Sequence, residues 1–159
     1  MTRAYRLTPV VRFFNALLRR LVPLGVVPGG VALLATAGCR TGRRHTTPVT
    51  PLEHAGRRYL VSPFGTRPWV LNVRASGEAE LRTGRRRECV ALTEVVDAAT
   101  AGPVLRRYLA ANRITADSFD ATPDSPVEAF EAEAARHPVF LVRPPGTSAG
   151  RSGSATPPG

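Results

Sequence analysis

The apolar residues near the N-terminus recur with the spacing of an α-helix. They are Val10, Val11, Phe14, Leu17, Leu18 and Leu21, with arginines and Asn15 between them. This pattern predicts an amphipathic helix from Pro9 to Val22. Pro23, Pro28 and three glycines interrupt the apolar stretch that continues to Leu34. The stretch is therefore not a continuous helix of about 20 apolar residues that could span a membrane.

Beyond this segment, short apolar runs alternate with polar residues, as in strands with one buried face. The predicted strands are Val31–Thr36, Thr47–Glu53, Arg58–Ser62, Glu78–Thr83 and Glu88–Glu94. The pair Ala55 and Gly56 predicts a tight hairpin between the second and third of these strands. Gly84 and the run Arg85–Arg87 predict another hairpin with a solvated tip.

Helix signals occur in three places after the first hairpin. Pro68–Ala75 reads as a short helix, and Pro103–Asn112 as a helix with proline in its first turn. Ser125–Glu128 has the sequence of a capping box and predicts a further helix that runs to about Arg136. Val139–Val142 is expected as a final apolar strand.

The predicted order of elements is a helix, several antiparallel strands, two helices and a strand. This order favours an α+β domain built on a small antiparallel barrel over a doubly wound parallel sheet. The 159 residues suffice for one hydrophobic core. We expect an amphipathic helix and linker over residues 1–30, the barrel domain over 31–143, and a disordered tail rich in Pro, Gly, Ser and Thr over 144–159.

The charge of the chain points to an anionic partner. The formal net charge is +10, and all 22 basic residues are arginines, whose planar guanidinium suits phosphate and carboxylate oxygens. GC-rich coding is an alternative cause of the arginine excess. Cys39 and Cys89 have no zinc-site spacing, so no metal is implied. Nucleic acid is not the expected partner, because the chain has no helix-turn-helix, zinc pair or aromatic stacking ladder.

The N-terminal region allows two interpretations besides a helix that packs on its own barrel. Leu21–Ala35 followed by Thr36 and Cys39 resembles a lipoprotein signal, but the prolines and glycines and the poor fit of Thr36 speak against it. A basic amphipathic helix that lies on the inner membrane surface fits better than this signal, and a helix that packs on its own barrel stays an equal alternative. The expected location is the cytoplasm, with possible peripheral membrane contact through residues 9–22.

The segment Gly38–Pro48 has the composition of an anion cradle. Its two glycines let backbone amides approach an anion, Thr41 adds a hydroxyl, and arginines add charge. It is neither a P-loop nor a dinucleotide fingerprint, because the required lysine ending and βαβ unit are absent. A solvated arginine-rich turn is the alternative interpretation.

This loop, together with Ser62 and Pro68–Val73, resembles the deazaflavin-dependent nitroreductase and quinone reductase family. The resemblance covers about Leu34 to Val142. It implies a split β-barrel that binds coenzyme F420 and transfers hydride from the reduced cofactor to a quinone, nitro compound or activated alkene. FMN is the alternative cofactor, and a barrel that binds a flavin, haem or lipid without turnover is the alternative function. Split barrels commonly dimerise, so a homodimer is expected by analogy.

The resemblance also implies a set of cofactor-binding residues. Arg40, Thr41 and Gly42 correspond to contacts with the phosphate region of the tail. His45, Pro48, Val49 and Thr50 would line the approach to the ring. Leu60, Val61, Ser62, Pro63, Pro68, Trp69, Val70, Leu71 and Asn72 would flank the deazaflavin, with Ser62 and backbone amides bonding its polar edge. No catalytic acid or base is assigned, because the cofactor carries the hydride.

Several residues depart from the family pattern or allow a plainer interpretation. Cys39 and His45 stand where arginine is usual, and Thr50 occupies the place of a ring-flanking tyrosine. Tyr108 and Phe119 are candidate aromatic replacements. Trp69 has the alternative role of a core residue, while His54 and His137 are expected as surface turn residues.

Overall fold

The computed structural model describes residues 16–17, 20–21, 30–37 and 43–146. Of the predicted N-terminal helix, Ala16, Leu17, Arg20 and Leu21 are described, and all four are helical. The rest of that helix, Cys39 and the centre of the predicted anion cradle lie outside the described residues. Within the described part of the chain, no helix has the length and apolarity needed to cross a membrane.

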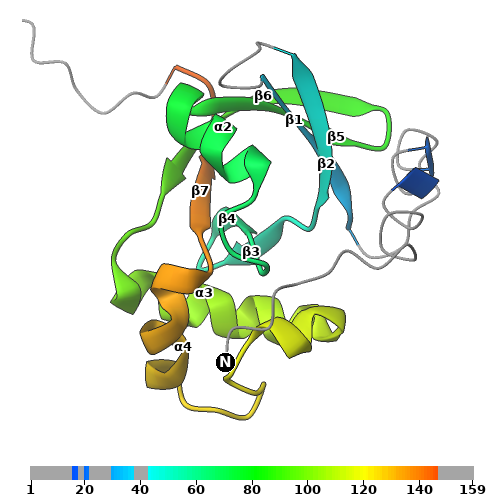
Figure 1. Ribbon diagram of the computed structural model, residues 1–159. Coiled ribbons are helices and arrows are strands. Elements are labelled where there is room, and N and C mark those ends of the chain that lie inside the picture. The colour runs from blue at the N-terminus through cyan, green and yellow to red at the C-terminus, as the bar shows by residue number, and fades with distance from the viewer. Residues whose placement is uncertain (1–15, 18–19, 22–29, 38–42, 147–159) are drawn as a thin grey trace, which may run out of the picture.

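Seven antiparallel strands form one sheet that curls into a half-barrel (Figure 1). The strands are β1 (Ala32–Ala37), β2 (Arg44–Val49), β3 (Leu52–His54), β4 (Arg57–Val61), β5 (Glu78–Thr83), β6 (Arg86–Glu94) and β7 (Val139–Arg143). Their order across the sheet is β2-β1-β5-β6-β7-β4-β3. The hairpins at Ala55–Gly56 and Gly84 are confirmed. Arg86 and Arg87 belong to β6 instead of the hairpin tip.

The single strand predicted over Thr47–Glu53 is wrong. The structure divides it into β2 and β3, which lie at opposite edges of the sheet. The chain leaves the sheet at Thr50 and Pro51, where proline has no N–H for a ladder hydrogen bond. His45, expected in a loop, is a residue of β2.

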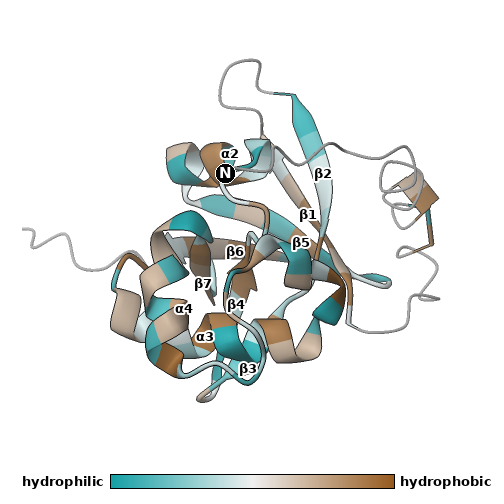
Figure 2. Cartoon of the chain, turned by 60° about the horizontal axis from the view of Figure 1, so that its bottom comes forward, coloured by the Kyte–Doolittle hydropathy of each residue, from teal (hydrophilic) through white to brown (hydrophobic). Residues whose placement is uncertain are grey.

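The alternating side chains of the sheet build two hydrophobic cores. Leu60 faces the inside of the half-barrel, whereas its neighbours Tyr59 and Val61 face the opposite side. The predicted helix at Pro68 is confirmed as α2 (Pro68–Ser76), and it closes the inner core. The outer core is covered by α3 (Ala98–Ala111) and α4 (Val127–Glu133), along which hydrophobic and hydrophilic residues alternate (Figure 2).

Two helix starts differ from the prediction. Helix α3 begins at Ala98, where the Asp97 carboxylate accepts a hydrogen bond of 3.0 Å from the Thr100 amide, so Pro103 lies inside the helix. The capping box of α4 does not form, because the Ser125 hydroxyl accepts from the Thr122 amide instead. The helix ends at Glu133, and a 3-10 turn, η3 (Ala134–Arg136), leads to the predicted final strand.

Close contact between α3 and α4 depends on Gly102. A Cβ at this position would lie 2.5 Å from Glu131 Cγ and 3.2 Å from the Glu131 amide nitrogen. Real Cβ atoms essentially never come within 3.0 Å of a neighbouring atom, so the shorter of these approaches would force a shift. The glycine therefore sets how near the two helices that cover the outer core can pack.

Candidate functional site

Two separated segments of the predicted site, in β2 and α2, are connected through β1. The Asn72 side-chain amide donates a hydrogen bond of 3.0 Å to the Thr36 hydroxyl, and both side chains are buried. Thr36 pairs with His45 across the β1–β2 ladder, so these two side chains share one face of the sheet. His45 itself is exposed. The contact links α2, β1 and β2 through polar groups at one end of the inner core.

The predicted ring-flanking residues at the end of β4 are core residues. Leu60 pairs with Phe140 inside the half-barrel, and Val61 packs beneath the helices on the opposite face. The Trp69 ring lies 5.4 Å from the Phe140 ring, centroid to centroid, in a tilted arrangement. These side chains are closed to solvent. A ligand at this surface can reach this part of β4 only through its backbone.

Ser62 begins a turn that leads from β4 to α2. Its amide donates to the Pro138 carbonyl at 2.9 Å, and its hydroxyl donates to the Gly65 carbonyl at 2.6 Å. The residue is buried, and both of its donors are engaged within the protein. What remains for an outside partner is the acceptor capacity of the hydroxyl oxygen.

The same turn is attached to His137, which the sequence led us to expect at the surface. That expectation is wrong, because His137 is only 3% exposed. Its Nδ1 lies 2.8 Å from the Pro63 carbonyl oxygen, and its Nε2 lies 3.2 Å from Glu133 Oε2. The imidazole also stacks on Phe119, with ring centroids 4.0 Å apart. The turn after β4, Phe119 and Glu133 together bury this residue, and none of them is close to it in a way that the His-Pro sequence indicates.

Glu133 extends the connection into the helical cover. It is 4% exposed and accepts hydrogen bonds from the amides of Asp120 and Ala121. Arg136 lies 3.3 Å from the Glu133 carboxylate and 2.7 Å from Asp120. These contacts give the buried Glu133 carboxylate its partners. They fix the turn at Pro63 to the segment that precedes α4.

The protonation of His137 follows from its surroundings. The Pro63 carbonyl can only accept, so Nδ1 carries a proton and donates it to this oxygen. Burial lowers the pKa of His137, while its hydrogen bonds to Glu133 and to the Pro63 carbonyl act in the opposite direction. The net shift is downward.

The solvent-accessible part of the predicted site is smaller than the full set. His45, Pro68 and Leu71 are exposed, and Pro48, Thr50 and Pro63 are half-buried. Val49, Leu60, Val61, Ser62, Trp69, Val70 and Asn72 are buried. Leu71 is 49% exposed, and the neighbouring turn presents Phe64 at 38%. Two large apolar side chains thus reach the surface within the segment expected to flank a planar ring, and Phe64 lies outside the set of residues that the family resemblance implies.

The two candidate aromatic replacements lie elsewhere. Tyr108 is buried in the outer core, where burial raises its pKa to about 12 against the lowering effect of a hydrogen bond with Thr115. Phe119 is occupied by its stacking on His137. Both side chains belong to the packing beneath α3 and α4. Arg40, Thr41 and Gly42 lie outside the described residues, whereas Arg44 of the same segment is paired with Glu80.

Solved structures with the same fold include proteins of different activity. An F420-H2-dependent reductase, FDR-A, aligns over 72% of this chain and 94% of its own length, with 19% identity and a TM-score of 0.50. A structure described as a domain-swapped dimer aligns over 86% of this chain and its whole length, with 18% identity and a TM-score of 0.53. HutZ, a haem storage protein of Vibrio cholerae, aligns over 88% of this chain and 91% of its own, with 11% identity and a TM-score of 0.50. At these identities the likeness shows the split-barrel fold alone.

The sequence family carries the functional assignment. No curated protein matches the chain. The family model described as F420H(2)-dependent quinone reductase matches residues 10–124, which is most of the chain and includes all segments of the predicted cofactor site. The protein is an F420-dependent oxidoreductase with the α+β split-barrel fold, and it belongs to the F420H(2)-dependent quinone reductase family.

Proposed function

We propose that the protein binds F420 across the surface formed by the β1–β2 connection, the turn after β4 and α2, and reduces a quinone there. A nitro compound or an activated alkene is the alternative acceptor. The observation that carries this proposal is the contact of Asn72 with Thr36, and of Thr36 with its ladder partner His45. It joins the Gly38–Pro48 segment to the Pro68–Val73 helix, two of the three motifs that were separate in the sequence.

The residues at this surface fit the chemistry of the cofactor. F420 combines a planar aromatic ring with an anionic tail. Phe64 and Leu71 offer exposed apolar surface for a ring, and such contact contributes through apolar burial and stacking. The arginine-rich segment beside β2 offers charge for the tail. When bound, the reduced cofactor supplies a hydride.

Each group of residues then has a distinct task. Arg40, Thr41 and Gly42 hold the tail phosphate region, and His45, Pro48, Val49 and Thr50 line the approach to the ring. The backbone of residues 60–63 and the start of α2 at residues 68–72 flank the ring. The Ser62 hydroxyl oxygen serves as an acceptor at its polar edge, because both Ser62 donors are engaged.

The protein contributes position, and position requires a rigid frame. The Ser62 amide and the Pro63 carbonyl are fixed by Pro138 and His137 respectively. The first turn of α2 is fixed by its buried residues Trp69 and Val70. Both segments that flank the ring are thus held by the core and do not rely on the ligand for their conformation.

Cofactor titration tests the assignment of the site. Oxidised F420 and, separately, FMN are titrated into the protein at low and moderate salt while cofactor fluorescence is followed. We expect F420 to bind in preference to FMN, and salt and Arg40→Ala to weaken its binding. Arg107→Ala on the exposed side of α3 is the matched control and leaves it unchanged. Equal effects of Arg40→Ala and Arg107→Ala would contradict a contact between Arg40 and the cofactor tail. Absence of F420 binding would contradict the whole site.

The acceptor, the membrane contact and the oligomeric state are part of the proposal. Reduction rates with F420H2 are compared between a soluble quinone, a nitroarene and an activated alkene, and the quinone is expected to be reduced fastest.

Residues 9–22 are proposed to contact acidic lipid at the cytoplasmic face of the membrane. Flotation of the protein with anionic vesicles tests this contact. Light scattering tests the homodimer.

A further inference from the structure

Three basic residues occupy one row on three neighbouring strands, away from the proposed cofactor surface. His54 of β3 pairs directly with Arg57 of β4. Arg58 pairs with Val142, so the same register continued by one residue places Arg57 beside Arg143 of β7. Residues opposite one another in a ladder point to the same face. His54, Arg57 and Arg143 therefore share the outer face of the sheet.

This basic row has no acidic partner among the residues that the structure describes. The next residue, Arg58, points to the inner face and is paired with Glu88. Arg44, Arg74 and Arg136 likewise have carboxylate partners. Neither Arg57 nor Arg143 forms an ion pair with any described residue. Like charges opposite one another destabilise a sheet, so this pair leaves a repulsion that the described protein groups do not relieve.

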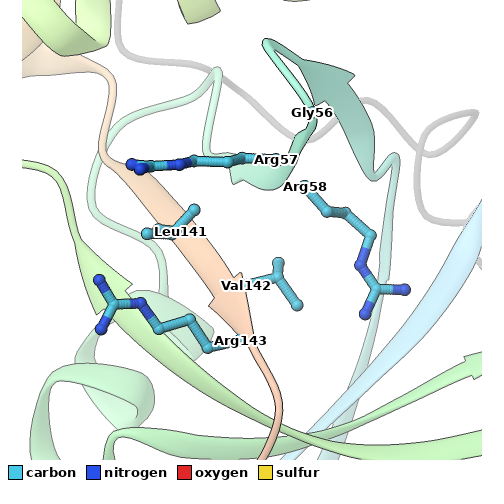
Figure 3. A pocket seen from close by; sticks show the side chains of 6 residues that line it. All are labelled: Gly56, Arg57, Arg58, Leu141, Val142 and Arg143. Atoms are coloured by element: carbon cyan, nitrogen blue, oxygen red, sulfur yellow. The ribbon is translucent and has the colours of Figure 1, made fainter. Parts of the chain in front are cut away.

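A surface hollow of about 300 Å³ lies at this point and is lined by Gly56, Arg57, Arg58, Leu141, Val142 and Arg143. Figure 3 shows that Arg57 and Arg143 extend to the same side of β7, with Leu141 between them, whereas Arg58 points to the other side. The volume is at the lower end of the range for small-molecule sites. The two guanidinium groups therefore border a space that a small ligand can enter.

We propose that this hollow binds an oxyanion, the phosphate or carboxylate group of a small anionic molecule, bridged between Arg57 and Arg143. Guanidinium groups recognise such groups through paired N–H donors, and charge-assisted hydrogen bonds of this kind are strong. His54 lies opposite Arg57 in the ladder, on the same face, and is not among the residues that line the hollow. The site is separate from the proposed cofactor surface, because Arg57 begins β4 and the turn to α2 follows its other end.

Thermal unfolding with pyrophosphate as the probe tests the site. A ligand that binds only the folded protein raises Tm. Pyrophosphate is expected to raise the Tm of the wild-type protein above its value in sodium chloride of equal ionic strength. Arg57→Gln and Arg143→Gln should lose this rise, with the apparent Kd weakened about tenfold or more. Both variants should also show a higher Tm than the wild type in chloride alone, because each removes the repulsion.

Two controls make the result specific. Arg107→Gln removes the same charge from an exposed position of α3 and should keep the pyrophosphate response. Titration of Arg143→Gln with F420 should give the wild-type affinity, which separates this site from the cofactor site. Equal responses in all variants, or no response in the wild type to either pyrophosphate or vesicles, would overturn the proposal. Loss of F420 affinity in Arg143→Gln would also overturn it as a separate site.

The source of the oxyanion is distinguished by a second measurement. Wild type and variants are sedimented with vesicles that contain an anionic phospholipid and with neutral vesicles. If the wild type and Arg107→Gln bind anionic vesicles, and Arg57→Gln and Arg143→Gln do not, the oxyanion is a lipid headgroup. A pyrophosphate response without such vesicle binding assigns it to a soluble phosphate compound.

Discussion

His137 and Pro63 are joined by a hydrogen bond of 2.8 Å between the imidazole Nδ1 and the backbone carbonyl oxygen. The bond connects the turn that follows β4 with the segment that follows α4. Glu133, at the end of α4, contacts the other ring nitrogen. One imidazole therefore connects the N-terminal half of the chain, at Pro63, with the C-terminal half, at Glu133. The stability of the protein and the geometry of the proposed cofactor surface therefore depend on the same residue.

Replacement of His137 tests this link. His137→Ala removes the stacking on Phe119 and leaves the Pro63 carbonyl and Glu133 each without one partner. The loss of unfolding free energy is expected to be about 1–3 kcal/mol or more, as for buried groups left unsatisfied. Urea denaturation measures it. His45→Ala, at an exposed position, is the control and should change stability by less than about 0.5 kcal/mol.

The pH dependence of stability follows from the pKa of His137. Burial lowers this pKa in the folded protein, so the unfolded chain, with a value near 6.5, binds the proton more readily. The contribution of His137 to the free energy of unfolding is complete above pH 6.5 and is lost as the pH falls through the folded-state pKa. Unfolding curves from pH 8 to pH 5 should show this decline. His137→Phe should have a flatter profile, and an unchanged profile would rule out His137 as its origin.

The buried hydrogen bond between Asn72 and Thr36 is suited to a double-mutant cycle. Asn72→Leu or Thr36→Val alone leaves one buried polar group unpaired and should cost about 1–3 kcal/mol. The double variant should cost less than the sum, because neither unpaired group remains. If the two costs add without coupling, the bond does not contribute in solution. F420 titration of the same variants reports whether the contact also positions His45.

Gly102→Ala tests the close approach of α3 and α4. The new methyl group would meet the Glu131 side chain at 2.5 Å and its amide nitrogen at 3.2 Å. Strain of this kind typically costs about 1–3 kcal/mol, which thermal unfolding should detect. Combination with Glu131→Ala should restore part of the loss, because the side-chain clash disappears and the approach to the backbone remains. A stable single variant would show that the helices move apart easily.

Part of the fold was predictable because its signals are local. The hairpin at Ala55–Gly56 has a glycine with φ of +71°, a conformation that glycine adopts readily. The start of α2 at Pro68 and the β7 strand were likewise predictable from residues that are neighbours in the sequence. The family resemblance rested on short motifs in order, and the match over residues 10–124 confirms it.

Other features depended on contacts between distant residues. Nothing between Thr47 and Glu53 indicates that the two halves of that run lie at opposite edges of the sheet. The pairing of Ser62 with Pro138, and of Pro63 with His137, joins positions more than 70 residues apart. Which residues of the predicted site are exposed and which are buried therefore depends on the tertiary structure.

The sequence by itself determined the family, the turns, most helices and strands and the surplus of arginine. The tertiary structure decided which polar groups are buried, which arginines have carboxylate partners, and that Arg57 lies beside Arg143. The physical reason is that turn and helix preferences act within a few residues. Burial and charge pairing act between strands that only the closed sheet brings together.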